Sequence, residues 1–182
     1  MQDLSLYNNK SFDPGAGVFV RALWYCVNAL FFDSWLMPLS KVKIIILRAF
    51  GANIGNNVVI KPKVNIKYPW NLKIGDNVWI GERVWIDNLT LVDIGNNVCI
   101  SQGVYLLTGN HNFKKRSFDL MVRTIVIKDC VWLGAKSIIT PGVVVNENVV
   151  VTVGQIVTKD ISQNTIFVTS KEDCSRVRSV VD

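Results

Sequence analysis

Residues 74–86 read IGDNVWIGERVWI, and this short stretch decides the fold. Ile74, Ile80 and Ile86 stand six residues apart, and a valine follows each of the first two after four residues. A period of six fits neither an α-helix nor the alternation of a simple strand; it is the hexapeptide form of the parallel β-helix repeat. Each hexad supplies one short strand and one turn, and three hexads close a triangular coil of about 18 residues.

The same spacing extends outward from that stretch in both directions. Its first positions form five groups of three, namely Ile54, Ile60 and Ile66; Ile74, Ile80 and Ile86; Ile94, Ile100 and Leu106; Ile127, Leu133 and Ile139; and Val145, Val151 and Val157. We expect these side chains, and the small or β-branched residues four positions later, to point inward and stack between coils. The sequence therefore predicts a mainly β protein, a left-handed parallel β-helix of about five coils over residues 54–162.

Two details complete this prediction. Glycine follows the first position at five sites, where we expect it to permit a positive φ at the turn: Gly55, Gly75, Gly81, Gly95 and Gly134. A sandwich of short strands, the alternative fold, does not explain so many first positions in register.

The repeat is interrupted at three places. Eight residues separate Ile66 from Ile74 and Ile86 from Ile94, which predicts a two-residue bulge at one corner. The third interruption, from Leu106 to Ile127, predicts a loop of residues 108–124 that leaves the regular scaffold. That loop holds His111, the only histidine of the chain, together with Lys114, Lys115, Arg116 and Asp119. A long excursion from a regular scaffold is usually functional.

The first 53 residues predict a separate helical segment. The run from Val18 to Met37 is long enough for a membrane span to be weighed, but it contains Arg21, Asn28 and Asp33. Its apolar residues recur at three- and four-residue spacing, which favours an amphipathic helix packed on the protein; a helix lying on a membrane surface is the alternative. A second helix is expected from Ser40 to Phe50, and residues 163–182 form a short tail.

Charge and cysteine content narrow the partners and the compartment. The chain has 20 Lys or Arg and 14 Asp or Glu, a formal charge of +6, which favours an anionic cofactor, glycan or membrane surface. No basic run with interleaved aromatic residues suggests nucleic-acid binding. A single histidine excludes multi-histidine metal sites, and we expect no metal. Four cysteines without CxxC spacing predict reduced thiols and a cytoplasmic protein, with a peripheral position at the inner membrane face as an alternative.

Several motifs resemble one enzyme family. Thr108-Gly-Asn-His111, the run from Ile125 to Ala135, Pro141-Gly-Val143 and the run from Val157 to Ile161 resemble the hexapeptide-repeat O-acetyltransferases of the galactoside and maltose type. Upstream motifs resemble more narrowly the colanic-acid biosynthesis acetyltransferases: Arg21-Ala-Leu-Trp24, Asn28-Ala-Leu-Phe-Phe32, Ile66-Lys-Tyr-Pro-Trp-Asn-Leu72, Trp85-Ile-Asp-Asn88 and Ile100-Ser-Gln-Gly103. The resemblance covers nearly the whole chain.

This resemblance implies a reaction and an assembly. The donor is expected to be acetyl-CoA and the acceptor a sugar hydroxyl, on a free or lipid-linked glycan of the cell surface. A homotrimer is implied, with sites in the clefts between β-helices. His111 matches the catalytic base, and imidazole suits the removal of a hydroxyl proton as the oxygen attacks a thioester. The alternative function is a non-catalytic β-helix that scaffolds a glycan-synthesis complex.

The resemblance also assigns further site residues. It implies that Asn88 binds the acceptor with its neighbour Asp87, and that Trp132 lines the cleft. Pantetheine is expected along Gly134, Ala135 and Gly154, and the 3′-phosphate of CoA near Thr158, Lys159, Arg176 and Arg178. Ordinary structural roles remain open for all of them: turn chemistry for Asn88 and the glycines, packing for Trp132, and solvation for the basic tail. Gln155 and residues 169–172 depart from the family pattern, so we expect the cofactor tail to be held loosely.

Overall fold

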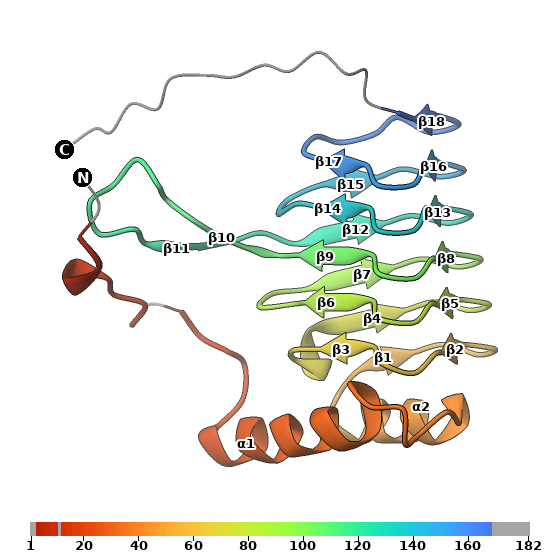
Figure 1. Cartoon of the computed structure of the whole chain (residues 1–182), viewed down its shortest axis with the longest axis horizontal. Coiled ribbons are helices and arrows are strands. Elements are labelled where there is room, and N and C mark those ends of the chain that lie inside the picture. Colours follow the sequence, from red (N-terminus) through yellow and green to blue (C-terminus); the bar gives the residue numbers. More distant parts are fainter. Residues whose placement is uncertain (1–2, 11, 169–182) are drawn as a thin grey trace.

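The computed structural model describes residues 3–10 and 12–168 of the 182-residue chain. Short parallel strands stack into three sheets, which we call faces 1, 2 and 3 and which form the sides of a prism (Figure 1). Face 1 contains β1 (Asn53–Ile54), β4 (Leu72–Ile74), β7 (Val92–Ile94), β12 (Ile125–Ile127) and β15 (Val144–Val145). Face 2 contains β2 (Val59–Ile60), β5 (Trp79–Ile80), β8 (Cys99–Ile100), β13 (Trp132–Leu133), β16 (Val150–Val151) and β18 (Ile166–Phe167). Face 3 contains β3 (Asn65–Ile66), β6 (Trp85–Asp87), β9 (Tyr105–Leu107), β14 (Ile138–Ile139) and β17 (Ile156–Val157).

This architecture confirms the predicted parallel β-helix. All of the predicted first positions are buried, from Ile54 to Val157, and they stack in register along each face. The number of coils differs slightly from the prediction. After five complete coils the chain begins a sixth, in which Ile161 bridges to Val145 and β18 pairs with β16. The sheet therefore continues past residue 162, into the part of the chain that we expected to be a tail.

The glycines at the turns have a different purpose from the predicted one. Gly55, Gly75, Gly81, Gly95 and Gly134 are not among the residues with positive φ. A Cβ on Gly134 would lie 2.6 Å from the carbonyl oxygen of Val151, so glycine is required because the next coil passes too close. A positive φ falls two residues after each of the five glycines, at Asn57, Asn77, Arg83, Asn97 and Lys136. Three of these positions hold asparagine, which tolerates that region well.

Two helices and a π-helical turn cover one end of the β-helix (Figure 1). They are α1 (Val18–Val27), the π-helical turn η2 (Asn28–Phe32) and α2 (Ser40–Ala49); the short 3-10 turns η1 (Leu4–Leu6) and η3 (Pro69–Asn71) complete the helical elements. The predicted second helix is confirmed to within one residue. The first ends at Phe32, earlier than expected, and none of the helices in residues 3–10 and 12–168 has the length and apolar character needed to cross a bilayer.

Side chains of the helical cap bind the free edge of the first coil. Trp24 Nε1 donates to the Ile66 carbonyl at 2.8 Å, and the Asn28 carboxamide oxygen accepts from the Ile66 amide at 3.2 Å. The Arg48 guanidinium donates to the carbonyl of Ile54, and the buried Lys43 ammonium donates to that of Lys61 at 2.8 Å. An open sheet edge is a template for aggregation, and these bonds block it on all three faces.

Candidate active site

The loop expected at residues 108–124 forms a β-hairpin. Its strands β10 (Gly109–His111) and β11 (Leu120–Val122) are antiparallel, with His111 opposite Leu120, and the hairpin extends away from the prism (Figure 1). Thr108 anchors it from a buried position, because its hydroxyl donates to the Asp87 carbonyl at 2.9 Å. Gly109 lies so close to the coil beneath that a Cβ would be 2.6 Å from a methyl group of Leu89.

His111 is held with a defined tautomer. Its Nδ1 lies 2.9 Å from the main-chain carbonyl oxygen of Phe118, and its ring stacks parallel on the Phe118 ring at a centroid distance of 4.3 Å. A carbonyl oxygen can only accept a hydrogen bond, so Nδ1 carries the proton and Nε2 carries the lone pair. The hairpin thus presents an imidazole whose Nε2 is ready to accept a proton.

A cavity of about 580 Å³ opens beside this imidazole. Asp87, Lys67 and Tyr68 line it from the prism, Arg21 from α1, and Tyr7 from the amino-terminal segment. The Lys67 ammonium pairs with the Asp87 carboxylate at 3.0 Å. The cavity therefore combines a base, a carboxylate and three cations, Lys10, Arg21 and Lys67, which suits a polar, hydroxyl-bearing ligand.

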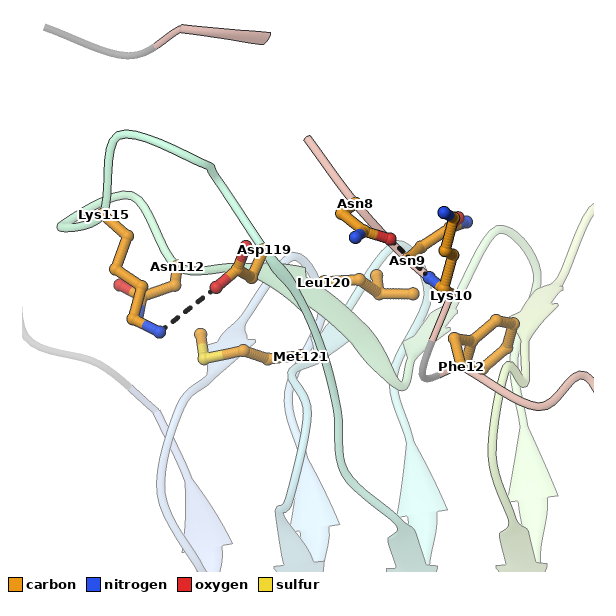
Figure 2. Close-up of a pocket in the computed structure, with 9 residues that line it drawn as sticks. All are labelled: Asn8, Asn9, Lys10, Phe12, Asn112, Lys115, Asp119, Leu120 and Met121. Atoms are coloured by element: carbon orange, nitrogen blue, oxygen red, sulfur yellow. Dashed lines mark hydrogen bonds and ion pairs between the residues drawn. The ribbon is translucent and has the colours of Figure 1, made fainter. Parts of the chain in front are cut away.

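The amino-terminal segment forms one wall of the cavity. The Asp3 amide donates to the Arg116 carbonyl at 3.0 Å, and the Tyr7 ring lies 5.8 Å from the His111 ring, centroid to centroid. Figure 2 shows a neighbouring cavity of about 630 Å³ between the hairpin and Asn8–Lys10, where Leu120, Met121 and Phe12 supply apolar contacts and Lys115 pairs with Asp119 at 3.2 Å. A hydrogen bond from the Ser117 hydroxyl, and then one from Lys115, hold the pKa of the Asp119 carboxyl below its usual range.

Asn88 and Asp87 occupy opposite sides of the backbone. The Asn88 side chain is fully buried; its oxygen accepts from the amides of Lys67 and Tyr68, and its nitrogen donates to the carbonyls of Tyr68 and Asn71. It cannot contact an acceptor without losing these bonds, so the structure makes Asn88 part of the scaffold, contrary to the role that we expected. Asp87 is the residue of the pair that lines the His111 cavity.

The cavity residues that sequence reasoning missed include Lys67, Tyr68, Tyr7 and Arg21, and the first two carried a signal. Lys67 follows Ile66 as Asp87 follows Ile86, so the repeat alone places them at one corner of adjacent coils, and Tyr68 comes next. Nothing in the sequence marked Tyr7 or Arg21, because they reach the site from segments outside the repeat.

The residues expected to hold pantetheine lie elsewhere on the chain. Gly134, Ala135 and Gly154 belong to turns at the corner between faces 2 and 3, and Trp132 projects from β13 on face 2, with its indole N–H donating to the Ser101 hydroxyl at 2.9 Å. In Figure 1 this face lies opposite the side from which the hairpin extends. One chain therefore does not bring these residues together with His111.

The same turns show how well they fit an extended ligand. Gly154 has a φ of +72° and open space where a Cβ would stand, whereas the half-exposed Trp132 ring reaches toward Ser101 of the preceding coil. Gly134 is packed against the next coil, so its lack of a side chain already has a structural reason. Open space at the backbone therefore makes Gly154 more accessible to an extended ligand than Gly134.

The residues expected near the CoA phosphate are only partly described. Thr158 and Lys159 are exposed and follow β17, at the corner from which the hairpin leaves two coils earlier. Arg176, Arg178 and the departing residues 169–172 lie outside the described residues. Gln155 is partly exposed, with its side-chain nitrogen 3.4 Å from the Val153 carbonyl oxygen. Within residues 3–10 and 12–168, no three His, Cys, Asp or Glu side chains gather in a way that could hold a metal ion.

Comparisons with known proteins agree with this geometry. No protein-family model matches the chain. A protein of Escherichia coli K12 that is named as the colanic acid biosynthesis acetyltransferase WcaF is 38% identical over 167 residues, 91% of each chain. A solved galactoside acetyltransferase in complex with coenzyme A is 25% identical, with a TM-score of 0.70 over 80% of this chain and 74% of that one. A hexapeptide-repeat acetyltransferase of Vibrio cholerae, solved with acetyl coenzyme A, shares the fold, with 19% identity and a TM-score of 0.74 over 87% and 88% of the two chains.

The chain resembles the WcaF protein over nine-tenths of both chains, and solved structures of the same fold contain coenzyme A or acetyl coenzyme A. This chain is therefore a hexapeptide-repeat acetyltransferase that uses acetyl-CoA as its co-substrate. The expectation of an acyltransferase is thereby confirmed over that of a non-catalytic scaffold. Within that class, the chain belongs to the family of the colanic acid biosynthesis acetyltransferase WcaF.

Proposed function

We propose that the chain transfers an acetyl group from acetyl-CoA to a sugar hydroxyl during the synthesis of an exopolysaccharide or another surface glycan. The observation that carries this proposal is the single imidazole, which lines a polar cavity and is fixed by the Phe118 carbonyl so that Nε2 carries the lone pair of a base. The name of the WcaF relative supports a surface polysaccharide as the product. The three described cysteines are free, which supports a reaction in the reducing cytoplasm.

His111 acts as a general base in direct transfer. Its Nε2 accepts the proton of the acceptor hydroxyl as that oxygen bonds to the thioester carbonyl carbon. When the tetrahedral intermediate collapses, the carbon–sulfur bond breaks, and the imidazolium returns the proton to the departing CoA sulfur. The products are an acetyl ester and free CoA, and no acetyl group is ever bonded to the protein.

We propose a homotrimer with a composite site. His111 and Asp87 lie on one side of a chain, whereas Trp132 and Gly154 lie on another, so two copies side by side would supply both halves of a site. The outward side chains of faces 2 and 3 support lateral contacts because large aromatic residues remain exposed there, namely Trp79, Trp85, Tyr105 and Trp132.

The cavity chemistry supports a sugar as acceptor. The Asp87 carboxylate accepts hydrogen bonds from hydroxyl groups, and Tyr68 offers an aromatic surface of the kind on which sugar rings lie. Lys67 and Arg21 add positive charge, which suits a glycan that carries an acidic group or a phosphate-linked carrier.

One assay tests the proposal. The full chain is mixed with acetyl-CoA and a panel of free and lipid-linked sugars, a thiol reagent reports free CoA, and mass spectrometry identifies the acetyl ester. We expect acceptor-dependent CoA release that His111→Ala removes, and an unmodified protein after incubation with acetyl-CoA alone. An acetylated protein, or equal CoA release by the His111→Ala variant on a confirmed acceptor, would refute the mechanism.

A further inference from the structure

The helical cap has a second apolar side that faces away from the β-helix. On α1, Trp24 is buried against the prism, while Phe19, Leu23 and Cys26 are exposed; Phe19 is 91% exposed. Leu30 of η2 continues the same spacing, three to four residues apart, and is also exposed. Such spacing places these side chains on one stripe of the helix, opposite the stripe that packs on the first coil.

The connection to α2 and α2 itself extend this surface. Trp35, Leu36 and Leu39 are exposed between the helices, and Ile45 is exposed on α2 beside the exposed Lys41. The Trp35 ring lies under the Arg83 guanidinium of the second coil, so we define the base surface by six other exposed residues of the cap: Phe19, Leu23, Leu30, Leu36, Leu39 and Ile45. Soluble monomers rarely expose so many large apolar side chains in one short segment, so this surface requires a partner.

The positive charge of the chain is concentrated around the base surface. Residues 17–73, the cap and the first coil with the turn that follows, contain eight Lys or Arg and one acidic residue, Asp33. Three of the lysines pair with carboxylates, namely Lys63 with Asp33, Lys67 with Asp87 and Lys73 with Asp93, and Lys43 is buried. Among the described residues, the other cations of this stretch, which have no carboxylate partner, are therefore Arg21, Lys41, Arg48 and Lys61. The whole chain has 20 basic and 14 acidic residues, so the remainder has 12 against 13 and no net positive charge. The partner of the base surface is therefore expected to be both apolar and anionic.

Lateral packing of copies leaves the base surface uncovered. The cap closes an end of the prism, whereas the exposed aromatic residues that suit contacts between copies lie on its sides (Figure 1). Burying a second copy against the base would also bring two strongly basic segments together, which like charges oppose. An anionic surface with an apolar interior meets both requirements.

We infer that the base surface docks on an anionic phospholipid bilayer, with the apolar residues in the interface and the basic residues toward the lipid headgroups. No part of the cap spans the membrane; it lies on it. Arg21 belongs to α1 and also lines the His111 cavity, so docking would hold that cavity close to the bilayer. The inference does not depend on acetyl transfer, since binding to a bilayer is measured without acetyl-CoA or an acceptor.

Vesicle binding by the full chain tests this inference. Vesicles of phosphatidylcholine, with or without phosphatidylglycerol, are floated with the protein at low and at high salt. We expect binding only with phosphatidylglycerol, and we expect high salt to weaken it. Phe19→Glu with Leu23→Glu should weaken binding at least about tenfold, because each charge opposes burial in the interface. Lys41→Glu should weaken it by roughly fivefold or more at low salt.

Matched controls keep the test independent of folding and of catalysis. Val153→Glu with Ile166→Glu alters two exposed apolar residues near the other end, and Lys128→Glu alters an exposed cation away from the cap. Both controls should bind vesicles like the unaltered chain, and every variant should keep its circular dichroism spectrum. Failure of the unaltered chain to bind phosphatidylglycerol vesicles would overturn the inference, as would equal losses in the base variants and the controls. A smaller oligomer for Phe19→Glu with Leu23→Glu, without vesicle binding by the unaltered chain, would assign the surface to a second copy instead.

Discussion

The β-helix and the hairpin that leaves it are stabilised in opposite ways. Along face 2, Ile80 stacks on Ile100 and Ile100 on Leu133, and the same contact recurs on every coil and every face. In the hairpin each contact occurs once. The Phe118 carbonyl accepts a hydrogen bond from Nδ1 of His111, and the Phe118 ring stacks on the imidazole. The Arg116 carbonyl accepts a hydrogen bond from the Asp3 amide.

This difference separates stability from chemistry. A repeated contact can be weakened at one coil while its neighbours persist, so the β-helix provides a rigid frame of many equivalent parts. A unique contact has no substitute, so the orientation of the base depends on a few atoms in an irregular segment. Changes in the hairpin should therefore affect turnover first, and changes in the prism should affect folding first.

The largest expected effect is the loss of turnover in His111→Ala. Removal of a general base costs about 10²- to 10⁴-fold in kcat, and the chain has no second histidine to replace it. Because no other imidazole can accept the proton of the acceptor hydroxyl, the loss should persist across a pH series. Steady-state rates measure the loss at each pH.

If the hairpin serves the chemistry and not the stability of the protein, His111→Ala should leave the fold intact. The melting temperature and the sedimentation coefficient should match those of the unaltered chain. A variant that unfolds or dissociates would show that the hairpin supports the scaffold, and the separation between the two regions would be lost.

Ile100→Ala tests the prism side of the comparison. Ile100 is fully buried between Ile80 and Leu133, so truncation should lower the free energy of unfolding by about 2–5 kcal/mol. The kcat of the protein that remains folded should not change. Urea titration measures the first quantity, and Lys73→Ala, an exposed substitution on β4, provides the control at about 0–1 kcal/mol. An equal loss in both variants would mean that stacking between coils does not dominate stability.

The repeat made the prism predictable and left the site largely unpredictable. A spacing of six specifies which side chains point inward, whatever their neighbours, and so all of the first positions from Ile54 to Val157 were correct. The purpose of the glycines was not correct, because the close approach of one coil to the next, as at Gly134, is a property of stacking and not of the single turn.

The errors in the site have specific physical causes. Both Asp87 and Asn88 were expected to bind the acceptor, but strand alternation counted from the inward Ile86 puts Asp87 outward, at the cavity, and Asn88 inward, in the scaffold. The antiparallel pairing within the hairpin and the contact of Tyr7 with His111 have no periodic signal, since each joins segments that occur once.

The next largest effect is a pH dependence of stability that arises in the helical cap, where each contact with the first coil occurs once. Lys43 is fully buried under Phe32, and burial lowers the pKa of its ammonium from 10.5 to about 8. Between these two pH values the unfolded chain holds a proton that the folded chain has lost, so stability from this group rises with pH from about 8 to about 10.5. The rise should reach roughly 3 kcal/mol, the shift expressed as free energy.

Comparison with Lys43→Met isolates that contribution. Free energies of unfolding from urea titrations across this pH range, unaltered chain minus variant, should increase with pH. Lys41→Met removes an exposed lysine from the same helix and should leave the pH dependence unchanged. If Lys43→Met also leaves it unchanged, the two carbonyl partners of the ammonium compensate for its burial, and the cap tolerates a charge as well as the surface does.

The smallest effect is expected for a substitution at Lys159, a residue of the β-helix that we expect near the 3′-phosphate of CoA. Lys159 is exposed at the corner that follows β17, and a lysine binds a phosphate there only through charge at a solvated position. Charge reversal by Lys159→Glu should therefore raise the KM for acetyl-CoA only several-fold and leave kcat nearly unchanged, since the reacting atoms lie with the hairpin. Acetyl-dephospho-CoA, which lacks the 3′-phosphate, should show almost no change in KM. Lys128→Glu reverses an exposed charge just after β12 and controls for the effect of the changed net charge on the electrostatic potential of the protein. Equal increases in KM for both donors would show that Lys159 does not bind the 3′-phosphate.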